Sequence, residues 1–113
     1  MDYVWCKVGI NLNLKCINTL KKRYTIPIGY SGHEASVTPS VIAASLGAAA
    51  IERHITLDRA MYGSDQAASL QPDGFRQLNT ILREIPGILG DGKKKILKEE
   101  EPIASKLRYW IQE

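Results

Sequence analysis

Two histidines are the residues of this 113-residue chain best placed to do chemistry together. His33 follows a short apolar run at residues 26–30, and His54 ends a second run at residues 49–54. A helical pattern separates the two runs, which predicts parallel strands whose carboxyl ends lie at the same edge of a sheet. Neighbouring strands lie about 4.8 Å apart, so both imidazoles could reach one metal ion. Two surface or hydrogen-bonded histidines would show the same spacing, and the spacing alone leaves both interpretations open.

Three further polar side chains lie near these histidines in the sequence. Ser31 stands two residues before His33, where a serine either caps a turn or binds a phosphate through its hydroxyl and nearby N–H groups. Asp58 and Asp65 follow His54 on a long loop. An aspartate there either forms a turn or reaches back to bind a polyol or orient a metal-bound water. For each residue both interpretations stay open on spacing alone.

The elements that must position these side chains alternate between helix and strand. Apolar residues recur at helical spacing over about residues 12–24, with Asn11 as a candidate N-cap. A second helix is predicted over about residues 39–46, capped by Thr38 and stopped by Gly47. This helix joins the two strands, and such a crossover is right-handed.

The rest of the chain is less regular. Residues 55–71 read as a long loop, and a loop of that length in a compact domain is usually functional or disordered. Pro72 begins a third helix, which Pro86 should kink or end because proline lacks the N–H that an interior helical position needs. Residues 1–10 are irregular, and residues 93–113 read as a polar tail.

Composition limits the class of protein. Apolar residues make up 44% of the chain, which predicts a folded core rather than disorder. A formal charge of +3 is too small to indicate nucleic-acid binding. No apolar run approaches the roughly 20 residues of a membrane helix, and no targeting signal is visible. Cys6 and Cys16 match neither a redox pair nor a zinc site, so we expect reduced thiols and a cytoplasmic protein.

Residues 1–113 are therefore expected to form a single, incomplete α/β domain. A sheet of two parallel strands leaves both outer edges unpaired. The chain is then either a piece of a larger α/β protein or a partner of another chain.

Several short motifs occur in a fixed order over about residues 11–108. They are Ile26-Pro-Ile-Gly-Tyr-Ser-Gly-His33-Glu34, Leu46-Gly-Ala, Ile51-Glu-Arg-His54-Ile-Thr-Leu-Asp58, Gly63-Ser-Asp65, Ala68-Ser-Leu70 and Leu89-Gly-Asp-Gly92. In this order and spacing they resemble the N-acetylneuraminate (sialic acid) synthase family. The resemblance implies a partial (β/α)8 TIM barrel, of which this chain holds the last two strands with flanking helices. Residues 26–30 and 49–54 would then be strands seven and eight.

The resemblance also implies a chemistry. The family is a group of transferases that condense phosphoenolpyruvate (PEP) with N-acetylmannosamine or its 6-phosphate, and a divalent ion, Mn²⁺ or Mg²⁺, polarises the aldehyde oxygen. Position by position, His33 and His54 match the family's metal ligands, and Ser31 matches a residue that holds the PEP phosphate. Asp65 matches the catalytic acidic residue that meets the sugar.

The same resemblance implies that groups which grip PEP come from earlier barrel strands, and that a sugar-binding arginine comes from a partner's C-terminal domain. We therefore expect the chain to need the missing barrel portion or a homo-oligomeric partner, and to be inactive by itself. The alternative is a non-catalytic structural or interaction remnant of the barrel.

Overall fold

The computed structural model describes residues 12–63 and 66–107. Within them the elements follow in this order: α1 (Cys16–Arg23), β1 (Tyr30–Gly32), α2 (Thr38–Ser45), β2 (Ile51–Arg53), the 3-10 helix η1 (Gln66–Ala68), α3 (Pro72–Leu89) and α4 (Glu101–Leu107). Asp65, Asn11 and the segment predicted to be irregular at residues 1–10 lie outside the described residues.

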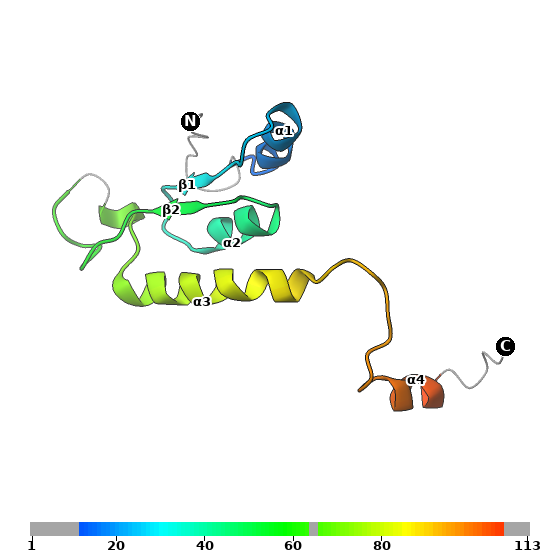
Figure 1. Ribbon diagram of the computed structural model, residues 1–113. Helices are drawn as coiled ribbons and strands as arrows, with labels where there is room; N and C mark the ends of the chain where they lie inside the picture. The colour runs from blue at the N-terminus through cyan, green and yellow to red at the C-terminus, as the bar shows by residue number, and fades with distance from the viewer. Residues whose placement is uncertain (1–11, 64–65, 108–113) are drawn as a thin grey trace.

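The two strands are parallel neighbours, as the sequence predicts. Tyr30 pairs with Ile51, and Gly32 pairs with Arg53. Helix α2 joins the strands and packs against both, and α3 packs against α2 on the side away from the sheet (Figure 1). The described part of the chain is thus one strand–helix–strand unit, with α1 and α3 beside it and α4 apart from it (Figure 1).

The first strand begins later than predicted. Regular strand geometry starts at Tyr30 rather than at residue 26. Backbone pairing already begins at Ile28, whose carbonyl accepts the Ala49 N–H at 2.7 Å. Pro27 has no N–H to donate, and Ile26 is 64% exposed. The strand-to-strand hydrogen bonds therefore do not extend to the residues before Ile28.

Helix α1 also begins later than its apolar pattern suggests. Asn13 has a φ of 48°, a left-handed conformation that asparagine tolerates but that a right-handed helix does not contain. Its carbonyl accepts the Cys16 N–H at 2.9 Å, and regular helix starts there. The predicted start at residue 12 was wrong because one left-handed residue interrupts an otherwise helical pattern.

The start of α2 uses a different cap from the predicted one. Thr38 is the first helical residue and makes no capping bond of its own. Its N–H instead donates to Ser36 Oγ at 3.1 Å. The predicted stop is confirmed, since Gly47 follows the helix with a φ of 97°, a conformation that favours glycine.

A small core joins three elements. Ile17 of α1, Tyr30 of β1 and Ala43 of α2 are all less than 5% exposed and form one cluster. Partly buried apolar side chains surround them, among them Ile28 and Ile51. The core therefore lies on the face of the sheet that α2 covers.

The third helix does not end where its proline predicts. Helix α3 runs from Pro72 to Leu89 without ending at Pro86. It ends at Gly90, whose φ is 66° and whose N–H donates to the Pro86 carbonyl at 3.1 Å. Pro86 is exposed and lies in the last turn, where the helix gives up one backbone bond and continues.

The segment predicted as a polar tail contains a helix. Helix α4 forms at Glu101–Leu107. The chain reaches it through an extended stretch that leads away from the sheet and from α3 (Figure 1).

Replacing Pro86 with alanine tests the cost of this proline. The Pro86→Ala variant restores an N–H that can bond the Leu82 carbonyl and removes the steric conflict of the ring. We expect the free energy of unfolding to rise by up to about 3 kcal/mol, measured by urea denaturation with circular dichroism at 222 nm. Gly87→Ala is the control, because it adds only helix propensity and should stabilise by about 1 kcal/mol. A Pro86→Ala variant no more stable than the control would contradict the helical path.

Candidate functional site

Each of the two histidines directly follows a strand. His33 comes after Gly32, the last residue of β1, and His54 comes after Arg53, the last residue of β2. Because the strands are parallel neighbours, the two side chains leave the same edge of the sheet. Their ring centroids lie 5.0 Å apart, with the ring planes at 70°. The proximity that the sequence predicts is therefore present.

Two more polar side chains share this face of the sheet. Side chains alternate between the two faces of a strand, so Ser31 lies on the same face as His33, and Glu52 on the same face as His54. Ser31 and Glu52 are also register partners. The Ser31 hydroxyl donates to Glu52 Oε1 at 2.8 Å. We call Ser31, His33, Glu52 and His54 the polar quartet.

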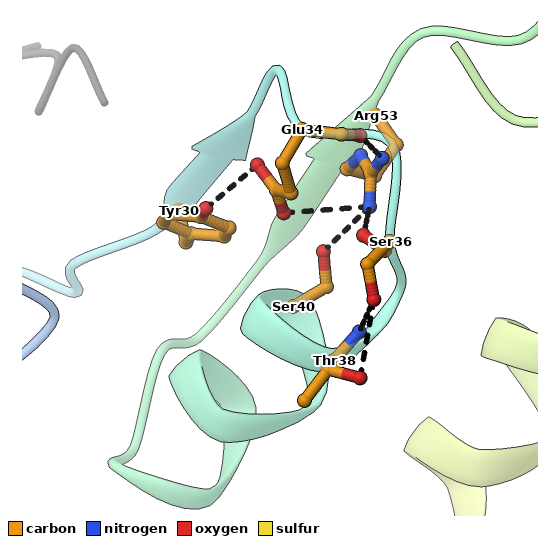
Figure 2. Close-up of polar contacts among 6 residues, drawn as sticks. All are labelled: Tyr30, Glu34, Ser36, Thr38, Ser40 and Arg53. Carbon is orange, nitrogen blue, oxygen red and sulfur yellow. Dashed lines mark hydrogen bonds and ion pairs between the residues drawn. The ribbon is translucent and has the colours of Figure 1, made fainter. Parts of the chain in front are cut away.

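The opposite face holds a buried ion pair directly behind the histidines. Arg53 Nη1 lies 3.4 Å from Glu34 Oε1, and the two side chains are only 1% and 4% exposed. Tyr30 donates its hydroxyl proton to Glu34 Oε2 at 3.0 Å. Figure 2 shows the carboxylate held between the tyrosine ring and the guanidinium.

The same guanidinium also holds the loop between β1 and α2. Arg53 Nη1 donates to the Ser36 carbonyl at 2.9 Å and to Ser40 Oγ at 3.2 Å, and Nη2 donates to the Glu34 carbonyl (Figure 2). Two atoms of the pair, Glu34 Oε1 and Arg53 Nε, are buried without a hydrogen-bond partner among the described residues. The loop that carries His33 is therefore fixed to the residue that precedes His54.

Gly32 leaves the space that this ion pair occupies. A Cβ atom at Gly32 would lie 2.8 Å from Arg53 Cδ and 2.8 Å from Glu34 Oε1. Real Cβ atoms do not approach other atoms so closely, so a side chain here would displace the pair. The glycine between Ser31 and His33 is thus explained by close packing on the far face.

The loop after β2 returns to the site. The Leu70 N–H donates to the His54 carbonyl at 2.8 Å, and the Thr56 N–H donates to the Leu70 carbonyl at 2.8 Å. The long loop is therefore anchored beside the second histidine. Asp58 forms a turn here, since its carboxylate accepts the Ala60 N–H at 2.9 Å. Asp65 lies outside the described residues.

The spacing of the histidines fits a shared metal ion. An imidazole centroid lies about 3.2 Å from an ion that its nitrogen binds, so two imidazoles at about 90–110° have centroids about 4.5–5.2 Å apart. The observed 5.0 Å falls in this interval. Two packed aromatic rings without an ion show similar separations, so the distance fits both arrangements. Within residues 12–63 and 66–107, no three His, Cys, Asp or Glu side chains gather closely enough to hold a metal by themselves.

Sequence reasoning missed Glu52 and the Arg53–Glu34 pair. Glu52 could have been found by counting in steps of two, since it precedes His54 by the same interval that separates Ser31 from His33. The ion pair gave no such signal, because charged residues are seldom buried and the sequence does not show which of them are.

Comparison with known proteins identifies the family. The model of the NeuB family matches residues 8–94. The chain belongs to the NeuB family. This confirms the resemblance that the sequence motifs carry. Among the described helices, none combines the length and the hydrophobicity that crossing a membrane requires.

Similar proteins are synthases of considerably greater length. The chain is 42% identical over 90 residues to N,N'-diacetyllegionaminic acid synthase of Campylobacter jejuni, covering 80% of this chain and 27% of that protein. It is 43% identical over 98 residues to the human N-acetylneuraminate-9-phosphate synthase, covering 86% of this chain and 27% of that protein. The chain thus spans just over a quarter of the length of these relatives.

A solved structure shows the same fold. The crystal structure of N-acetylneuraminic acid (sialic acid) synthetase from Leptospira borgpetersenii, in complex with citrate, matches 99% of this chain and 39% of its own. The TM-score is 0.73 and the sequence identity is 32%. The α/β fold of this NeuB-family chain is therefore similar to that of a sialic acid synthetase.

Breaking the buried ion pair should destabilise the NeuB-family fold strongly. In Arg53→Met the Glu34 carboxylate stays buried without its counter-charge, which typically costs about 3–5 kcal/mol. We expect a loss of that order in the free energy of unfolding, measured by urea denaturation. The matched control is Arg83→Met on the exposed side of α3, where the change should stay within about 0.5 kcal/mol. Equal effects of the two variants would show that the pair is not buried in solution.

Proposed function

We propose that the chain forms the last two βα units of a NeuB-type synthase barrel, which condenses PEP with an N-acetylmannosamine-type sugar. The observation that carries the proposal is the pair of imidazoles, 5.0 Å apart at the carboxyl ends of adjacent parallel strands. Active sites of barrels built from βα units lie at this end of the strands. Membership of a family whose relatives are synthases supports the reaction type.

His33 and His54 are the residues that would hold a divalent cation, Mn²⁺ or Mg²⁺. Two imidazoles occupy only part of the coordination sphere of such an ion and leave the remaining positions to oxygen ligands. When bound, the ion would supply Lewis-acid polarisation of the sugar's aldehyde oxygen. The chain's own contribution is to keep both rings at the same edge of the sheet, which the parallel register and the ion pair behind them achieve.

Ser31 is the residue that would bind the phosphate of PEP, and Asp65 the acidic residue that would meet the sugar. The Ser31 hydroxyl donates to Glu52, so a phosphate at this position must compete with that carboxylate for the hydroxyl proton. Binding of the anion therefore requires the hydroxyl to turn away from Glu52.

The structure supports a requirement for a completing partner. Apolar side chains that a barrel would cover are open, with Ile26 64% and Leu57 83% exposed. A hollow of about 660 Å³ extends along β1, lined by apolar residues of α1 and of the segment before β1. We propose that the missing barrel portion, or a homo-oligomeric partner, covers these surfaces.

Removal of either histidine tests the proposed metal site. We expect His33→Ala and His54→Ala each to weaken Mn²⁺ binding by about tenfold or more, because each removes one of two protein ligands. The signal of free Mn²⁺ in electron paramagnetic resonance measures this binding without any need for turnover. Asn79→Ala, on the exposed side of α3, should leave Mn²⁺ affinity unchanged. Unaltered affinity in both histidine variants would favour two packed rings without a metal role.

The reaction itself is tested by phosphate release from PEP on addition of N-acetylmannosamine. We expect no release by the 113-residue chain alone, since substrate positioning is worth about 7–11 kcal/mol of the barrier and the other barrel strands would provide it. Release should appear when a polypeptide carrying the preceding βα units of a NeuB-family barrel is added, and His33→Ala should abolish it. A complex that forms and binds Mn²⁺ but never turns over would instead indicate a non-catalytic remnant.

A further inference from the structure

Glu52 is an acidic side chain of the polar quartet to which the proposed reaction assigns no role. It is exposed, and it lies at the centre of β2 beside its register partner Ser31. Its Oε1 accepts the Ser31 hydroxyl proton at 2.8 Å. Within the described residues it makes no ion pair, because Arg53, the nearest cation along the strand, points to the other face and binds Glu34.

Glu52 lies close enough for its charge to act both on the two histidines and on Ser31. A strand rises about 3.3 Å per residue, so side chains two residues apart on one face are separated by about 7 Å. Glu52 is therefore one such step from His54, and one diagonal neighbour from His33 on the paired strand. Its distance from the Ser31 hydroxyl is that of a hydrogen bond.

We propose that Glu52 couples cation binding to anion binding on this face. Its carboxylate attracts a divalent cation toward His33 and His54. The same carboxylate accepts the hydrogen bond of the Ser31 hydroxyl and repels a phosphate group. The anion therefore binds weakly until a cation has offset the negative charge. This inference rests on the proposed roles of the histidines and Ser31, and it adds an order to them, with the cation binding before the phosphate.

Coulomb's law sets the expected size. A unit charge about 7 Å from a divalent ion, in surroundings close to water, changes affinity by roughly fivefold to tenfold. Neutralising Glu52 should therefore weaken Mn²⁺ binding by about that factor. It should strengthen binding of inorganic phosphate in metal-free buffer by a similar factor, because the variant removes repulsion and releases the Ser31 hydroxyl. Opposite signs from one substitution distinguish a charge effect from a general loss of structure.

The experiment uses the full chain and two probes. Mn²⁺ affinity is measured from the free-ion signal in electron paramagnetic resonance, and inorganic phosphate affinity by phosphorus-31 NMR in buffer containing EDTA. Glu52→Gln should lower the first and raise the second, while Glu52→Asp, which keeps the charge, should stay near wild type for Mn²⁺. Glu84→Gln on α3 makes the same charge change away from the sheet and should alter neither affinity. Ser31→Ala should lose phosphate binding but keep Mn²⁺ affinity.

The outcomes separate this inference from the proposed function. If Mn²⁺ binds through the histidines and Glu52→Gln matches Glu84→Gln with both probes, the role of Glu52 is overturned and the metal site stands. If Glu52→Gln weakens the binding of both Mn²⁺ and phosphate, the carboxylate maintains the structure of the site and does not act through its charge, and the proposed coupling is wrong. If neither His33→Ala nor His54→Ala changes Mn²⁺ affinity, the metal site and the Glu52 inference fall together.

Discussion

Arg53 and Glu34 bury opposite charges at the carboxyl end of the sheet, and three segments of the chain meet on that pair. One guanidinium contacts the loop after β1, the first turn of α2 and the carboxylate beside His33. Such a pair adds little stability in itself, because desolvation offsets the attraction, but removing one partner leaves a buried charge that is costly. The pair therefore fixes one arrangement of the loop more than it adds to the total stability.

This buried pair also separates the two faces of the sheet by charge. On the α2 face, one positive and one negative group neutralise each other among buried side chains. On the opposite face, which carries the polar quartet, Glu52 is the acidic residue. Side-chain alternation assigns adjacent residues of β2 to opposite faces, so Glu52 and Arg53 differ in environment although they are neighbours in sequence. A cation bound at the proposed site would therefore meet Glu52 without competition from the guanidinium.

Local rules predicted most of the fold. The parallel strands, the helix between them and the stop at Gly47 follow from periodicity and from the conformational preference of glycine. The element boundaries did not follow, because tertiary details decide them. A left-handed Asn13 delays α1, and the missing N–H of Pro27 delays β1. Pro86 was expected to kink or end α3, and the helix does not end there but continues to Leu89, before Gly90, at the cost of one backbone bond.

The site was predictable to the extent that it depends on strand ends. Two histidines that follow two parallel strands must share an edge, whatever the remaining sequence is. What holds them there could not be predicted, because it requires knowing which charged side chains are buried. Glu34 directly follows His33 and Arg53 directly precedes His54, so the ion pair on one face fixes the backbone from which the imidazoles leave on the other. The backbone that carries the two histidines is therefore positioned by contacts on the other face of the sheet. Gly32 has no side chain, which leaves space for the ion pair. A substitution at Gly32 would displace the pair and so shift the backbone of both histidines without contacting either ring.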